Sequence, residues 1–481
     1  MTTRTDESEL RHEPSEGSTP MSIRKSLMSL VLVAALGVLG CDSLSGPNTN
    51  NPSVSSLAEN PTAAAVASAA QGMQITNRAN VGGPGGTVST LGIVGRTSLN
   101  LDAADPRWVS ELMEGPLDPA AFGGFMWFAP YRDIRQGNLI RDAVPQVSDG
   151  EMPQPEKEAV LGFVKTLQAY DFLQIIVTRD ENGAPVDVGT PVNEDPAPVV
   201  DKRGVYDHIV QLLDEAQGHL QSAGGSFPFE LSSGYTDGGF DTPATFLEFN
   251  RALAARVFVY MAGEFDDAGF YSDALTALDA SFLDEGASLD LGVYHAFGTG
   301  SGDATNGIAA TARGGNPNIR AHPSLDDDVE MQGDGETPDA RFLEKTRPID
   351  FREFGGIGSD IGFDIYQSNG ADIPIIRNEE LILLRAEANI GLGNLALAED
   401  DINLVRTESG GLPEKDISSM TQAQALDALL YEKKYSLLFE GGHHWIDMRR
   451  YDRLGELPIM LPSGEVHTQF PFPDGEQRAR Q

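Results

Sequence analysis

Residues 374–408 read PIIRNEELILLRAEANIGLGNLALAEDDINLVRTE, and this stretch decides the fold. Apolar side chains at Leu381, Leu384 and Ala388 recur at helical spacing, and the same spacing resumes at Leu395 after two glycines. Small residues on both sides of the glycines let two helices approach closely, and a glycine closes the turn between them. The stretch therefore predicts an antiparallel helical hairpin of the tetratricopeptide type.

A second segment repeats this pattern upstream. Ala252, Ala254 and Ala255 precede Gly263, and Ala274 follows it. Apolar periodicity predicts further helices over about 155–173 and 202–221 and a last long helix through 426–437. We therefore expect a mostly α protein whose hairpins stack at irregular intervals.

Long polar stretches separate the predicted hairpins. They cover residues 178–200, 223–243 and, above all, 284–348, which is rich in Gly, Asn and Asp and has little helical period. Loops of this length in a compact protein are usually functional or disordered. We expect an irregular, loop-rich part there and little β-structure, with 361–366 as a short candidate strand.

The N-terminal region reads as a secretory signal. Arg24 and Lys25 precede the uncharged run 27–40, LMSLVLVAALGVLG, which is too short to span a bilayer. Cys41, the only cysteine, follows directly, and the junction resembles a bacterial lipobox, in which the cysteine is acylated. The alternative is an ordinary cleaved signal with an incidental cysteine.

These features divide the chain into four expected parts. Residues 1–20 are acidic and aperiodic, and we interpret them as a mis-called extension before a start at Met21. Residues 21–40 form the predicted lipoprotein signal peptide. Residues 41–61 form the lipid anchor and a Ser-, Asn- and Pro-rich tether, and 62–481 form a single domain.

Composition limits the partners. Residues 1–40 hold four basic and five acidic residues, which leaves 30 Lys and Arg against 67 Asp and Glu, a net charge of −37. Such a field repels nucleic acid and anionic lipid headgroups. With no cysteine beyond Cys41, no disulfide framework or thiolate metal site is available.

No motif indicates catalysis. A nucleophile elbow, HExxH and a P-loop are all absent from the sequence. Asp326–Asp328 with Asp334 lack the EF-hand spacing and read as a solvated acidic loop. His443 and His444 are adjacent, so their rings diverge by about 100° on a helix and are interpreted as structural. We predict no catalytic residue, no metal and no cofactor.

Residues 431–450, YEKKYSLLFEGGHHWIDMRR, supply the most specific motif. Together with 374–406 and the upstream segments 127–140, 203–216 and 252–260, they resemble the SusD/RagB family. Members are outer-membrane lipoproteins that capture nutrients for a TonB-dependent transporter. The resemblance spans about 71–454 and departs from the family at His444, where Arg is usual before Trp.

The resemblance implies a SusD-like fold, with helical hairpins on one side and a loop-rich ligand-facing part on the other. It implies a lipid-anchored protein of the outer membrane, surface-exposed, that passes an oligosaccharide or another nutrient to a SusC-like transporter. Two alternatives stay open. One is a lipid-anchored helical-repeat scaffold for envelope assembly, and the other is a secreted glycoside hydrolase with an unrecognised carboxylate pair.

Aromatic side chains are the candidate ligand contacts. Asp105 and Pro106 predict a helix start that places Trp108 in the first turn, where its indole would stack on a sugar ring or pack in the core. Tyr235, in a predicted loop, and the pair Tyr294–His295, at the edge of the glycine-rich loop, are comparable candidates.

Other motif residues are expected to be architectural. Glu440, Asp447 and Arg450 are predicted to form buried charge pairs that hold the last helix to its neighbours. Trp127 and Trp445 lie in helical motifs and are predicted to be core residues.

Overall fold

The computed structural model describes residues 57–189, 195–301, 303–309 and 316–481. The predicted signal peptide, Cys41 and most of the tether lie outside these residues. From Leu57 onward the described residues belong to one compact unit. This unit is mostly helical, as predicted, with few short strands.

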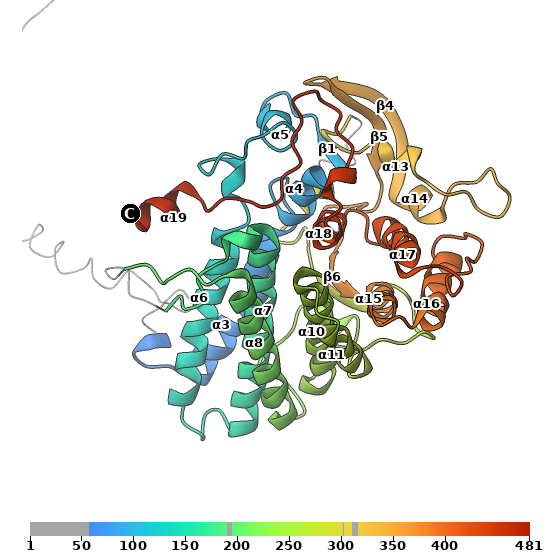
Figure 1. The fold of residues 1–481 in the computed structure, drawn as a ribbon. Coiled ribbons are helices and arrows are strands. Elements are labelled where there is room, and N and C mark those ends of the chain that lie inside the picture. Colours follow the sequence, from blue (N-terminus) through green and yellow to red (C-terminus); the bar gives the residue numbers. More distant parts are fainter. Residues whose placement is uncertain (1–56, 190–194, 302, 310–315) are drawn as a thin grey trace, which may run out of the picture. The chain divides into compact units, whose positions relative to one another are not determined.

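Long helices run in antiparallel pairs (Figure 1). The first group packs α3 on α6, α6 on α7 and α7 on α8, and the later pairs are α10 with α11 and α15 with α16, followed by α17. Their bounds are α3 Ala63–Asn77, α6 Phe128–Ala143, α7 Gln154–Arg179, α8 Lys202–Ser222, α10 Pro243–Phe265, α11 Gly269–Asp279, α15 Asn378–Gly391, α16 Leu395–Glu408 and α17 Gln422–Ser436. The two hairpins predicted from the alanine–glycine pattern are confirmed as α10–α11 and α15–α16.

Shorter helices connect these pairs. They are α4 Thr87–Val94, α5 Arg107–Ser110, α9 Ser233–Thr236, α13 Ser324–Asp327, α14 Ala340–Lys345, α18 His443–Arg450 and α19 Asp474–Ala479. Single 3₁₀ turns occupy η1 Arg78–Asn80, η2 Phe122–Gly124, η3 Val144–Gln146, η4 Asp180–Asn182 and η5 Leu454–Glu456.

Side-chain caps determine where several helices begin. Thr242 and Thr245 form a capping box at the start of α10, and Thr421 and Gln424 form another at α17. At the other end, α10 runs past Gly263 to Phe265, and Asp266 ends the helix in the left-handed region with φ 50°. The turn therefore begins at Asp266, three residues after the glycine at which it was expected.

Helix α7 lies at the centre of the largest apolar core. Residues 154–182 are the one described segment long and apolar enough to cross a membrane by length and composition, yet 94% of the most apolar stretch is buried inside the protein. Neighbouring parts of the protein cover its apolar surface. A second apolar cluster lies under α17 and the β-hairpin, and a third joins α15, α16 and α17.

In the described residues, three two-stranded antiparallel sheets interrupt the helices. Strand β1 (Ser98–Asn100) pairs with β3 (Ile319–Ala321), β2 (Gly292–His295) pairs with β6 (Ile373–Arg377), and β4 (Thr346–Phe354) pairs with β5 (Ile357–Phe363). In β4–β5, Thr346 is opposite Phe363, and Gly355 and Gly356 close the turn with φ of 63° and 83°.

The stretch 284–348 is thus less irregular than expected, because it contains β2, β3, α13, α14 and the start of β4. Local periodicity missed these elements because each is short, and because β2 and β3 pair with strands far away in the sequence. The candidate strand at 361–366 is the end of β5, which stops at Phe363.

Candidate functional site

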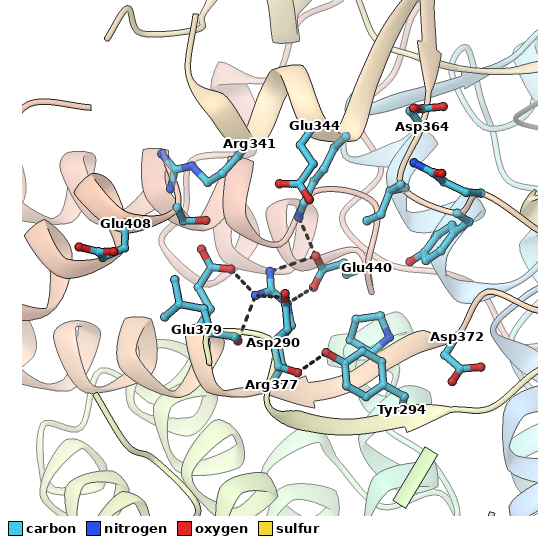
Figure 2. Close-up of a pocket in the computed structure, with 17 residues that line it drawn as sticks. Asp290, Tyr294, Arg341, Glu344, Asp364, Asp372, Arg377, Glu379, Glu408 and Glu440 are labelled. Atoms are coloured by element: carbon cyan, nitrogen blue, oxygen red, sulfur yellow. Dashed lines mark hydrogen bonds and ion pairs between the residues drawn. The ribbon is translucent and has the colours of Figure 1, made fainter. Parts of the chain in front are cut away.

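A cavity of about 460 Å³ opens where β2 and β6 meet α14, the end of α16 and the turn after α17 (Figure 2). Most of its lining side chains are polar or charged. They are Leu289, Asp290, Tyr294, Arg341, Glu344, Lys345, Asp364, Ile365, Tyr366, Gln367, Asp372, Pro374, Arg377, Glu379, Glu408, Ser409 and Glu440. Its volume lies within the range of small-molecule sites.

A buried ion-pair network surrounds Arg377 at the end of β6. Its Nε lies 3.0 Å from Glu440 Oε2 and its Nη2 lies 3.1 Å from Glu440 Oε1, a two-pronged contact. Nη1 bonds Glu379, and Lys345 Nζ lies 2.6 Å from Glu440 Oε1. Figure 2 shows Arg377, Glu379 and Glu440 converging on one point of the cavity wall.

The charges in this network stabilise one another. Burial alone would raise the pKa of Glu440, but Arg377 and Lys345 outweigh it and lower the pKa to about 2. Burial would also raise the pKa of Glu379. The positive charges of Arg377 and, to a lesser extent, Lys345 outweigh this effect and lower its pKa below the usual value. Both carboxylates stay ionised at neutral pH and are held in one geometry.

The turn that carries Glu440 is itself strained. Phe439 has a left-handed φ of 61°, unusual for a large side chain. Its ring stacks on Phe363 with centroids 3.9 Å apart, and its carbonyl accepts a 2.8 Å hydrogen bond from the Tyr366 hydroxyl. These two contacts hold the turn so that Glu440 points at Arg377.

Arg341 extends the network toward α17. Its Nη2 lies 2.6 Å from Asp339 Oδ2 and 2.7 Å from Glu432 Oε2, and its Nη1 donates to Ser436 Oγ at 3.0 Å. The cationic lining groups are thus matched with carboxylates, which makes the wall rigid. A rigid wall of this kind loses little entropy when a ligand binds.

Carboxylates dominate the mouth of the cavity. The lining contains seven acidic and three basic side chains, a formal charge of −4. Glu344 and Glu408 are exposed, and the side chain of neither makes a hydrogen bond or ion pair within the described residues. Burial raises the pKa of Asp372, whose Oδ1 accepts from the Phe297 amide at 2.9 Å. These oxygens can accept hydrogen bonds from hydroxyl or ammonium groups and would repel an anion.

Of the four aromatic candidates, Tyr294 alone lines this cavity. It lies on β2, half-buried, and its hydroxyl donates to the Asp290 carbonyl at 2.5 Å, which fixes the ring. A fixed aromatic ring beside carboxylates is a suitable surface for stacking a sugar.

The other three candidates are buried away from it. Trp108, in α5, is 8% exposed, and its ring lies 4.4 Å from that of Phe122, so it packs in the core. Its helix begins one residue later than predicted, at Arg107, although Asp105 still accepts from the Arg107 amide. Tyr235 lies in α9, where a loop was expected, and packs against Phe246.

His295 lies on β2, one residue after Tyr294, and its side chain points to the opposite face. Its Nε2 is 3.1 Å from the Tyr170 hydroxyl, and burial lowers its pKa to about 3. It is therefore neutral at physiological pH and belongs to the core beneath the strand.

The predicted architectural residues behave as expected. Arg450 Nη2 lies 2.5 Å from Asp447 Oδ1 and 2.7 Å from Glu387 Oε1, with these side chains almost fully buried, and Glu440 is paired as described above. Trp127 and Trp445 are 2% and 0% exposed. The predictions of buried charge pairs and of two core tryptophans are confirmed.

Sequence reasoning did not single out Arg377 and Glu379 as site residues. Their signal is the run IIRNEELILL, in which charges interrupt an otherwise apolar stretch. Charged groups in a buried segment require partners, and such networks mark functional sites often enough to be worth testing.

The acidic loop and the paired histidines have structural roles. Asp334 Oδ1 accepts from the Glu336 and Thr337 amides, and Asp328 pairs with Lys434 at 2.7 Å. His443 and His444 open α18, and burial lowers the pKa of each, to about 3 for His444. Within the described ranges, no three His, Cys, Asp or Glu side chains gather closely enough to hold a metal.

Comparison with known proteins agrees with this architecture. Residues 362–478 match the model of the SusD family. A SusD superfamily protein from Parabacteroides distasonis shares the fold with a TM-score of 0.64 at 16% identity, covering 87% of this chain and 97% of that one. A SusD homolog from Bacteroides thetaiotaomicron gives 0.65 at 15% identity, covering 90% and 98%. No curated protein matches the chain.

A further SusD/RagB family protein from Bacteroides thetaiotaomicron has a TM-score of 0.59 at 16% identity, covering 85% of this chain and 94% of that one. The helical hairpins and the short sheets of this chain thus form a SusD-like fold. The match of residues 362–478 to the SusD family model, together with this fold, supports SusD/RagB membership.

Proposed function

We propose that this protein is a non-catalytic lipoprotein of the outer membrane that binds a glycan or another hydroxyl-rich nutrient and passes it to a SusC-like TonB-dependent transporter. The observation that carries the binding proposal is the cavity, where the fixed ring of Tyr294 lies beside the ion-paired floor of Arg377 and Glu440 and a rim of carboxylates. The match of residues 362–478 to the SusD family supports a binding protein rather than an enzyme.

The electrostatics of the floor favour binding over hydrolysis. A retaining or inverting glycosidase needs one carboxylic acid whose pKa is raised, so that it can protonate the leaving group. Ion pairing lowers the pKa of both Glu379 and Glu440, which makes them permanent hydrogen-bond acceptors. Asp372 has a raised pKa, so it is the lining group on which the hydrolase alternative would depend.

Binding is tested by calorimetry against a panel of neutral oligosaccharides. We expect Tyr294→Ala to weaken the best ligand by about tenfold or more, because the ring loses its stacking partner. Tyr294→Phe should keep most of the affinity. Phe351→Ala removes an exposed ring from β4, outside the cavity, and serves as the matched control.

Three outcomes would contradict the binding proposal. If the best ligand bound wild type and Tyr294→Ala with equal affinity, this cavity would not be the binding site. Release of reducing ends that stops in Asp372→Asn would favour the hydrolase. A chain that binds no member of the panel and co-purifies with envelope proteins would favour the scaffold.

Anchoring is a separate part of the proposal and rests on Cys41. We expect Cys41→Ala to leave unprocessed or soluble protein, because the acyl chains that would hold the mature protein in the membrane are lost. Fractionation after a high-salt wash measures this, and Cys41→Ala protein that remained with the outer membrane would contradict the anchor. The proposed partnership is tested by asking whether a plug-and-barrel transporter co-purifies with the wild-type protein.

A further inference from the structure

A second cavity, of about 430 Å³, lies between the start of α6, the stretches 185–188 and 196–197, and the C-terminal α19. Ring and proline side chains form much of its wall, among them Tyr131 and Pro185, joined by a 2.9 Å hydrogen bond from the Tyr131 hydroxyl to the Pro185 carbonyl. Arg480 closes one end, where Nη1 donates to the Ala197 carbonyl at 2.7 Å. These contacts tie three separate segments into one hollow.

One face of α6 borders this cavity. Phe128, Arg132 and Arg135 recur at positions i, i+4 and i+7, which places them in line on the helix surface. The Phe128 ring is 57% exposed, and both arginines are exposed. An apolar ring therefore lies next to two guanidinium groups at the edge of the hollow.

The two arginines differ from the other basic residues of the chain. Across the described ranges, every other Lys and Arg side chain makes at least one hydrogen bond or ion pair, whereas Arg132 and Arg135 make none. This occurs in a sequence with 72 acidic residues and 34 basic ones. Like charges three residues apart on a helix repel each other, so the two arginines do not stabilise the helix by contact with each other.

The charge of this hollow is opposite to that of the first cavity. Its lining contains Arg132, Arg135 and Arg480 against Glu476, a formal charge of +2. Glu476 is already bound by Arg480 at 2.6 Å, so it does not neutralise the α6 pair. An arginine fork matches a carboxylate in two-pronged geometry, and the adjacent ring offers an apolar face.

We propose that this hollow is a second binding site, for a ring-bearing carboxylate, with the carboxylate on Arg132 and Arg135 and the ring against Phe128. Acidic saccharide units and aromatic carboxylic acids share this chemistry. The site is independent of the first cavity and would let the protein hold an acidic ligand that the carboxylate-lined cavity repels.

Calorimetry on the intact chain tests this with four probes: digalacturonate, its methyl ester, phenylacetate and the neutral amide of phenylacetate. We expect at least one of the two acids to bind, and its neutral counterpart to bind at least tenfold more weakly. Binding by digalacturonate alone identifies the saccharide source, and binding by phenylacetate alone identifies the aromatic one. Raised salt should weaken binding because the contact is between exposed charges.

The double variant Arg132→Gln/Arg135→Gln should reduce affinity for the acid at least tenfold, and Phe128→Ala should reduce it severalfold. All three side chains are exposed, so melting temperatures should stay near wild type. The control Arg107→Gln/Arg453→Gln removes the same charge from an exposed and a half-buried arginine outside this hollow and should leave affinity unchanged. Tyr294→Ala should also leave it unchanged, which separates this site from the first cavity.

Several results would overturn the proposal. The first is equal affinity of the acid for wild type and the Arg132/Arg135 double variant, and the second is equal affinity of an acid and its neutral counterpart. The third is loss of acid binding in Tyr294→Ala. The fourth is that neither acid binds at millimolar concentration. None of these bears on whether neutral oligosaccharides bind the first cavity, so the two proposals fail separately.

Discussion

Arg377 and Glu440 form a two-pronged ion pair, with contacts of 3.0 and 3.1 Å, between the end of β6 and the turn before α18. The two residues are 63 positions apart in the sequence. Both side chains are about 95% or more buried, so the pair is shielded from water and salt. It joins the helical part of the protein to the wall of the first cavity.

Glu440→Gln should destabilise the protein strongly, by about 3–5 kcal/mol, because it leaves Arg377 and Lys345 buried without their shared carboxylate. Chemical unfolding measures the change. Glu456→Gln, which removes a carboxylate paired with Arg453 at the surface, is the control and should cost about 1 kcal/mol or less.

The pH dependence of Glu440 follows from its lowered pKa. A carboxyl whose folded pKa is about 2, against 4.5 unfolded, contributes stability that is complete above about pH 5 and is lost as pH falls toward 2. In Glu440→Gln the wild-type decline over that window should be shallower. An unchanged slope would show that other carboxylates control acid unfolding.

Asp171→Asn should stabilise the protein. Asp133 and Asp171 are buried together, and burial raises the pKa of both, to about 6 for Asp133. A raised folded pKa means that stability is complete below about pH 4 and is lost as pH rises through the folded value. An amide keeps the 2.8 Å contact from Asn77 and removes the need to bury this charge.

We therefore expect Asp171→Asn to gain about 1 kcal/mol or more above pH 7, with the gain disappearing near pH 4. Melting curves at both pH values measure it. Asp142→Asn, an exposed acid on α6, should show no such pH-dependent gain. Destabilisation of Asp171→Asn at pH 7 would contradict the paired-acid account.

Gly391→Ala should destabilise the α11–α15 contact. A Cβ at this position would lie 2.0 Å from the Tyr271 ring, so the helices would have to separate. Overpacking of this kind costs about 1–3 kcal/mol. Gly218→Ala, in α8 with open space around it, is the matched control and should gain about 0.5–1 kcal/mol from helix propensity. If Gly391→Ala and Gly218→Ala changed stability equally, the contact between Gly391 and the Tyr271 ring would not limit the packing of α11 on α15.

Trp108→Ala should lower the free energy of unfolding by about 3–5 kcal/mol, because the indole fills space against Phe122 and Phe125. Ligand affinity of the fraction that stays folded should not change, since Trp108 does not line the first cavity. Denaturation and calorimetry on the same preparation give both numbers. If Trp108→Ala lost ligand affinity while its melting temperature stayed unchanged, Trp108 would be a ligand contact and not a core residue.

Several site features could not be read from the sequence. Asp290, Arg341, Arg377 and Glu440 come together only because β2 pairs with β6 and α14 packs on α17. The unpaired state of Arg132 and Arg135 is equally invisible, because their spacing on α6 says nothing about which carboxylates lie nearby. Of the aromatic candidates, local pattern found Tyr294 but could not tell it from three buried rings.

The sequence by itself determined the hairpins α10–α11 and α15–α16, because helical periodicity and small residues at a contact act between neighbours in the chain. It also determined that Glu440, Asp447 and Arg450 would be buried and paired, since charges in an apolar segment need partners. Tertiary structure alone decided the short sheets, the two cavities and their opposite charges. Those depend on contacts between residues tens to hundreds of positions apart, whose energies no local pattern records.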